Sequence, residues 1–188
     1  MKIYLIKNQL GGFRTIKPQT PESHNHLLEG YGTPLHAIWA PITFKWDTED
    51  GQTIPDCFLY LGSILIANEK CTKQITSTPG NEDIECLPIN IEGEHYYIIN
   101  TCITESNLLN TNNSKIEYFK DESIKWIREY IFYPQTHCPP LFHIAQIATP
   151  LFASEAFVNT YINSNFTGLK FEECKQKNTS ILKSIFKR

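Results

Sequence analysis

The chain has 188 residues, of which 41 % are hydrophobic and 20 % are charged, and its formal net charge is −3. A chain of this length and composition fits one globular domain with a sizeable core, which argues against disorder. No stretch approaches the roughly 20 apolar residues of a membrane span. The apolar run within Met1–Lys7 is also too short for a signal peptide. We therefore expect a cytoplasmic protein.

The first part of the chain predicts several strands. Residues 2–7 alternate well enough for a strand, and residues 8–34 form a long connection with little periodicity. Residues 35–46 predict a strand interrupted at Pro41, followed by an acidic turn. Residues 56–61 are almost continuously apolar and predict a short strand.

A strand–helix–strand unit then occurs twice. Leu65–Glu69 leads into a helix ending near residue 75 and a strand at 84–91, and Leu151–Glu155 leads into a helix ending near residue 162 and a strand at 168–173. Asn68 and Ser154 each supply an oxygen that can cap a helix N-terminus. A strand containing a phenylalanine, at position 58 or 142, precedes each unit. This parallel predicts an internal duplication.

The other segments predict further strands. Residues 94–102 form a hairpin with residues 84–91 across Glu92-Gly93, and residues 114–119 and 141–145 are shorter strands. Residues 124–133 fit a helix or an alternating strand, and their aromatic and β-branched content favours the strand. We expect an α+β fold, mostly antiparallel sheet with two or three short helices.

Charge is unevenly distributed along the chain. Residues 175–188 contain five basic residues and no acidic one, so the remainder has 12 basic and 20 acidic residues and a charge of −8. An acidic body favours a basic partner and disfavours nucleic acid. The basic segment has apolar residues at helical spacing and predicts an amphipathic helix. It would pack on the body, pair with a second copy as a homodimer, or contact a membrane, and we prefer the first. The predicted organisation is one domain over residues 1–174 and a tail over 175–188.

The six cysteines predict reduced, buried thiols, because no two lie closer than fourteen residues and no CxxC unit occurs. His137-Cys138, with His143 nearby, is the most tempting catalytic pair, but sequence neighbours seldom form such a dyad. His24, His26 and His36 lack an accompanying acidic or thiol ligand at a recognised spacing for a metal. Gly11-Gly12 fits no phosphate-loop pattern. We expect no enzyme, no cofactor and no metal site.

Several short motifs occur in a characteristic order. They are Met1–Lys7, Pro55–Phe58, Leu65–Glu69, Glu85–Pro88, Tyr96–Asn100, Pro140–Ile144, Leu151–Phe157 and Phe166–Phe171. Over about residues 1–174, this order resembles the immunity proteins of bacterial polymorphic toxin systems, in the eleventh immunity family. The resemblance implies a cytoplasmic protein that binds and neutralises a toxin encoded beside it. It supplies no catalytic residues and does not cover the basic tail.

A toxin inhibitor needs charge complementarity to its target. We predict that Asp47, Glu49 and Asp50, or Asp121 and Glu122, face a basic toxin surface, although each residue also fits an ordinary solvated turn. Two alternatives to the inhibitor stay open. One is a hydrolase-type enzyme using Cys138 and His143, and the other is a structural or regulatory module that self-associates.

Overall fold

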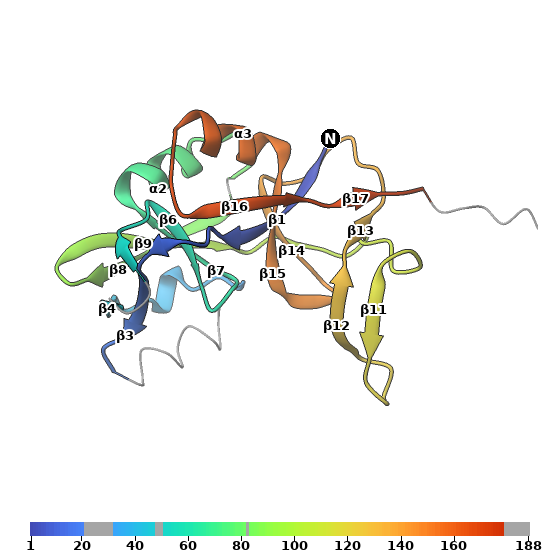
Figure 1. Cartoon of the computed structure of the whole chain (residues 1–188), viewed down its shortest axis with the longest axis horizontal. Helices are drawn as coiled ribbons and strands as arrows, with labels where there is room; N and C mark the ends of the chain where they lie inside the picture. Colours follow the sequence, from blue (N-terminus) through green and yellow to red (C-terminus); the bar gives the residue numbers. More distant parts are fainter. Residues whose placement is uncertain (21–31, 48–50, 82, 179–188) are drawn as a thin grey trace, which may run out of the picture.

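The computed structural model describes residues 1–20, 32–47, 51–81 and 83–178 (Figure 1). In these residues strands predominate and two α-helices occur, so the fold is α+β with a sheet-rich character. The elements are β1 (Ile3–Asn8), β2 (Gly12–Phe13), β3 (Thr15–Pro18), η1 (His36–Ile38), β4 (Ile42–Asp47), β5 (Gly51–Thr53), β6 (Cys57–Tyr60), β7 (Ile64–Asn68), α2 (Glu69–Thr76), β8 (Ile84–Ile91), β9 (Glu94–Thr101), β10 (Thr104–Glu105), β11 (Lys115–Tyr118), β12 (Ile124–Glu129), β13 (Ile131–Phe132), β14 (Leu141–Ile144), β15 (Ile147–Ser154), α3 (Glu155–Asn163), β16 (Leu169–Glu173) and β17 (Lys175–Gln176). Neither of these α-helices is long and apolar enough to cross a membrane.

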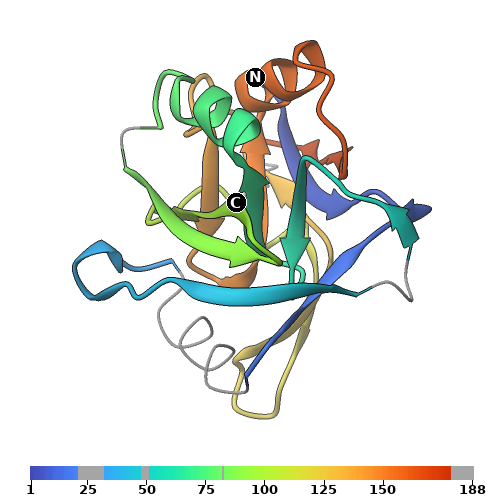
Figure 2. The same ribbon diagram turned by 90° about the vertical axis from the view of Figure 1, so that its left-hand side faces the viewer.

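Two sheets form the body of the molecule (Figures 1 and 2). The larger has the strand order β3-β4-β8-β9-β7-β6, and the smaller has the order β10-β14-β15-β1-β16. Hairpins such as β6–β7, β8–β9 and β14–β15 pair antiparallel, whereas β4–β8 and β10–β14 pair parallel. The two sheets are therefore mixed. The described residues also contain the strand pairs β11–β12, β13–β17 and β2–β5.

The larger sheet is buried on both faces at its β6–β7 end. In β6, Cys57 and Leu59 belong to one core cluster, whereas Phe58 and Tyr60 belong to another on the opposite face. The Tyr60 ring also packs on Phe44 of β4 at 5.5 Å between centroids, although three strands separate β4 from β6 in the sheet. The sheet must therefore curl around its second cluster. Burial on both faces explains why β6 is an almost unbroken apolar run.

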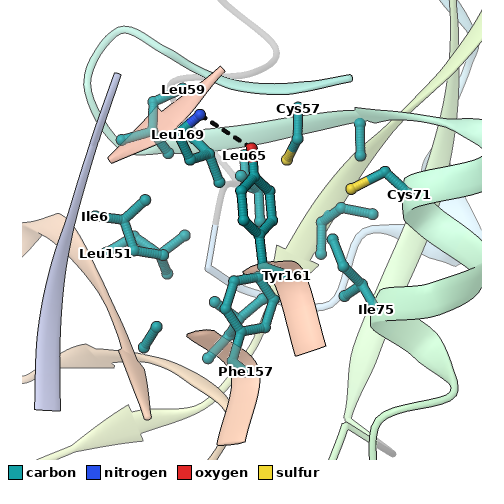
Figure 3. Packing of buried hydrophobic residues seen from close by; sticks show 14 of the residues in the cluster. Ile6, Cys57, Leu59, Leu65, Cys71, Ile75, Leu151, Phe157, Tyr161 and Leu169 are labelled. Carbon is teal, nitrogen blue, oxygen red and sulfur yellow. Dashed lines mark hydrogen bonds between the residues drawn. The ribbon is translucent and has the colours of Figure 1, made fainter. Parts of the chain in front are cut away.

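The first cluster lies between the two sheets and the two helices. Both N-caps predicted from the sequence are confirmed: the Asn68 side chain accepts from Cys71 N, and the Ser154 side chain accepts from Phe157 N. Figure 3 shows Tyr161 of α3 inside this cluster, where its hydroxyl accepts a hydrogen bond from Leu169 N at 3.1 Å. That bond ties α3 to the first residue of β16.

A third cluster holds the β11–β13 segment against the outer face of the smaller sheet. Phe152 of β15 is its centre, with Tyr130, Phe132 and Phe142 at ring-centroid distances of 5.1, 5.2 and 5.8 Å. Ile127 of β12 is also buried there. These contacts anchor the base of the β11–β12 hairpin, which projects from the body in Figure 1.

The two sheets are joined where the turn before β16 meets the start of β6. The Asp56 carboxylate accepts from Thr167 N at 3.0 Å and from its Oγ1 at 2.8 Å, and Cys57 N donates to Thr167 O at 3.1 Å. Asn68 Nδ2 donates to the other Asp56 oxygen at 2.9 Å. Gly168 has φ +104°, and a Cβ there would lie 2.1 Å from the Cys57 carbonyl oxygen. We call this set of contacts the sheet joint.

A side chain extends the joint along the edge of β6. Asn8 Nδ2 donates to Leu59 O at 2.8 Å, and Leu59 N donates to Asn8 Oδ1 at 2.6 Å. The Asn8 amide thus bonds to β6 as the backbone of a neighbouring strand would. It covers an edge that would otherwise be open to another chain.

Two predictions from the sequence are wrong in part. Residues 36–38 form the 3₁₀ turn η1, so the strand expected over residues 35–46 begins only at Ile42, the first residue of β4. Leu35 N and His36 N donate to the Glu85 carboxylate, which holds this segment by a side chain and not by a partner strand. The tail does not begin as a helix, because Lys175 and Gln176 form β17 beside β13. Its residues 179–188 lie outside the described residues.

Replacing Gly168 with alanine is expected to weaken the sheet joint. The new Cβ would collide with the Cys57 carbonyl, and alanine disfavours a positive φ. We expect Gly168→Ala to lower the free energy of unfolding by at least about 2 kcal/mol, measured by urea denaturation. Gly93→Ala is the matched control, since Gly93 has φ +94° but no atom within 4 Å of its added Cβ. Equal losses in the two variants would contradict the steric role of Gly168.

Candidate functional site

The cysteine that the sequence singled out is not set up as a nucleophile. Cys138 is 5 % exposed, and burial raises the pKa of its thiol to about 11. Its sulfur lies 3.8 Å from the sulfur of Met1. A cysteine nucleophile acts as the thiolate, so Cys138 is protonated and weakly reactive at neutral pH. His143 is buried in β14.

All six cysteines are free, as expected of reduced thiols, but the predicted burial holds for only three of them. Cys57, Cys71 and Cys138 are buried, and the other three are partly exposed. Figure 3 places Cys57 and Cys71 within the first core cluster, where burial raises the pKa of Cys57. These two thiols act as small apolar core groups.

No group of three histidine, cysteine or acidic residues within the described ranges could hold a metal ion. Of the three histidines considered from the sequence, His24 and His26 lie outside those ranges. His36 lies in η1, and its backbone N donates to Glu85 at 2.9 Å.

One buried polar cluster holds a loop in place. Asn100 is fully buried; its Oδ1 accepts from Gly32 N, and its Nδ2 donates to Thr33 O and to Glu85, each at 2.8 Å. Burial alone would raise the pKa of Glu85, but hydrogen bonds from Leu35 N, His36 N and Asn100 outweigh it and lower the pKa. The Glu85 carboxylate is therefore ionised and anchors residues 32–36 to the sheet.

A groove of about 1010 Å³ lies beside β16. We call it the β16 groove. It is bounded by β1 and β16, by β12, by the turn between β6 and β7, and by part of β15. These elements come from separate parts of the sequence.

Two large apolar side chains are exposed in this groove. Trp126 of β12 is 59 % exposed, and Leu61 in the β6–β7 turn is 47 % exposed. Leu61 has φ +52°, a left-handed conformation that a bulky residue rarely adopts. An exposed leucine in this backbone conformation is a candidate for a binding role.

The rim of the groove carries paired charges. Glu129 bridges Lys115 and Lys175 at 2.6 and 2.5 Å, and Lys7 contacts Glu172 at 2.5 Å. Hydrogen bonds from Lys115 and Lys175 hold the pKa of Glu129 at about 2. Two lysines share this one carboxylate, so the Lys115 end of the groove carries an excess positive charge.

Of the acidic residues predicted to meet a toxin, the three that the structure describes (Asp47, Asp121 and Glu122) do not line the groove. Asp47 ends β4 and pairs with Lys17 at 3.2 Å, whereas Glu49 and Asp50 are outside the described residues. Asp121 and Glu122 lie in the β11–β12 turn, where Asp121 accepts from Ser123. Figure 1 places that turn at the opposite side of the molecule from β4. The structure does not bring the two acidic groups together, and their binding role stays a prediction.

Sequence reasoning missed Leu61 and Trp126 as site residues. Trp126 fits the alternating strand predicted over residues 124–133, and no local pattern distinguishes an exposed tryptophan from a buried one. Leu61 precedes Gly62 in the three-residue turn between β6 and β7, at a position of positive φ where asparagine or glycine is usual. That mismatch was the one signal available.

In comparisons with known proteins, no family model matches the sequence, and no curated protein is significantly similar to it. The resemblance to the immunity family therefore stays a prediction from the sequence motifs.

The Glu129 bridge predicts a defined pH dependence of stability. Because the folded-state pKa of Glu129 is about 2 and its ordinary value is 4.5, the ionised side chain stabilises the fold above pH 4.5. That contribution is lost as the pH falls from 4.5 to 2. We expect the difference in Tm between the wild-type protein and Glu129→Gln to shrink over this range, in thermal unfolding at low salt. A difference that stays constant from pH 6 to pH 2 would contradict the bridge.

Proposed function

We propose that this chain is an immunity protein of a bacterial polymorphic toxin system. It acts in the cytoplasm, binds a cognate toxin domain one to one, and neutralises it by that binding without enzymatic chemistry. The observation that carries the proposal is the β16 groove, whose lining includes the exposed side chains of Leu61 and Trp126. Exposed tryptophan in a concave surface is typical of the few residues that dominate binding energy at protein interfaces.

The sequence motifs support the same function independently. Their order resembles an immunity family, and the groove supplies a surface on which such a protein could hold a partner. Asp47, Asp121 and Glu122 would lie at the periphery of the contact, where exposed charges act mainly on the association rate. In this proposal residues 1–174 form the toxin-binding domain, and residues 175–188 form a basic tail that follows it.

We also propose that the fold contains a duplication. The hairpin β6–β7 leads directly into α2, and the hairpin β14–β15 leads directly into α3. In each unit the last strand residue caps the helix, through Asn68 or Ser154. A Cα superposition that matches the two capping residues tests the idea. Helices that leave their hairpins at clearly different angles would argue against a common origin.

The function is tested with the toxin domain encoded beside this chain. We expect co-expression to protect a sensitive bacterium, and the purified proteins to form a one-to-one complex by light scattering. Cys138→Ala should protect as well as the wild-type chain, because the protonated, buried thiol takes no part in binding. Protection that is lost in Cys138→Ala while the complex still forms would favour the hydrolase alternative. Absence of any complex would contradict the inhibitor.

A further inference from the structure

The outer edge of β16 has a short open stretch. Gln9 N donates to Gly168 O at 2.8 Å and Cys174 N donates to Ile3 O at 2.9 Å, at the two ends of the β1–β16 pairing. Backbone groups alternate between the two sides of an antiparallel strand. The even-numbered residues of β16 therefore bond to β1. Phe171 and Glu173 turn their N–H and C=O groups to the other side.

Both ends of that outer edge are occupied. At one end Thr167 O accepts from Cys57 N in the sheet joint, and Leu169 N donates to the Tyr161 hydroxyl. At the other end Lys175 pairs with Ile131 of β13. Within the described ranges, no strand pairs with β16 between these two ends. The opening thus contains the outward groups of Phe171 and Glu173, and Glu173 lines the β16 groove.

Unpaired strand groups beside a groove favour an extended chain as the occupant, because a strand presents donors and acceptors at the matching spacing. The walls add two requirements. Leu61 and Trp126 favour apolar side chains. Lys115 and Lys175, which share Glu129, favour an acidic group at that end of the groove.

We propose that an extended segment of the partner protein binds in the β16 groove as an added β-strand. Its backbone pairs with Phe171 and Glu173, its apolar side chains contact Leu61 and Trp126, and a carboxylate approaches Lys115 and Lys175. This assignment rests on the proposed function, since the partner is the toxin domain. It differs from the acidic-surface prediction, because the groove takes an acidic and apolar segment rather than a basic one.

The strand pairing is tested with two substitutions at one position. Glu173→Pro removes the outward N–H, which takes no part in the pairing with β1, and proline is tolerated at such edge positions. Glu173→Ala removes the same carboxylate but keeps the N–H. We expect the toxin domain to bind Glu173→Pro at least about tenfold more weakly than Glu173→Ala by isothermal titration calorimetry. Equal affinities for the two folded variants would overturn the pairing.

Amide exchange followed by NMR tests the same pairing in the wild-type chain. In the free protein the amides of Phe171 and Glu173 should exchange rapidly, whereas those of Lys170 and Glu172 are protected by β1. Saturation with the toxin domain should slow the exchange of Phe171 and Glu173 at least about tenfold. Unchanged exchange at both residues in the complex would overturn the proposal, even if Glu173→Pro fails to fold.

The groove walls are tested with a matched pair of aromatic residues on one hairpin. Trp126→Ala should weaken binding of the toxin domain at least about tenfold. Tyr118→Ala should not, because Tyr118 is exposed on the same hairpin but does not line the groove. Toxin binding that is equal in both variants would overturn the site but leave the inhibitor function intact. Failure of the toxin domain to bind the wild-type chain would overturn both the site and the inhibitor function. If the chain forms a dimer that Glu173→Pro abolishes, the β16 edge binds a second copy of this chain instead of the toxin.

Discussion

The contact between Asp56 and the Thr167-Gly168 turn is the constraint on which the rest of the fold depends. It joins the two sheets where β6 and β16 would otherwise be separate edges. The same carboxylate accepts from Asn68, whose other side-chain atom caps α2. One acidic side chain therefore couples the sheet joint to a helix N-terminus. Gly168 is required because the Cys57 carbonyl fills the space in which any other residue would place its Cβ.

The sequence predicted well those elements whose signal is local. Helix caps at Asn68 and Ser154 are local, because the capping oxygen and the N–H that it accepts are three residues apart. The long strands were recognisable because burial on one or both faces imposes an apolar pattern. Strands of two or three residues, such as β5, β10 and β17, carry no such pattern, since they exist only because a distant strand lies beside them. The turn η1 was missed for the same reason, because Glu85 holds it from another strand.

Several motif residues behind the family resemblance have structural roles. Asp56 and Thr167-Gly168 form the sheet joint, and Glu85 and Asn100 hold the segment that leads into η1. The candidate site is built differently. Leu61, Trp126 and Glu173 come from three separate hairpins or strands and share no motif. A site assembled only by tertiary contacts cannot be recognised by spacing along the chain. The sequence therefore pointed to the acidic turns as binding residues and gave no sign of the β16 groove.

The geometry of the β16 edge also bears on specificity. A long open strand edge would pair with almost any extended chain and would favour aggregation. Here the sheet joint closes one end and β13 closes the other, which leaves the outward groups of Phe171 and Glu173 between them. Two residues of backbone pairing bind weakly on their own, so a segment must also satisfy Leu61, Trp126 and the lysine pair to remain bound. In the proposed inhibitor, the strand edge would therefore supply orientation, and the walls of the β16 groove would select the partner.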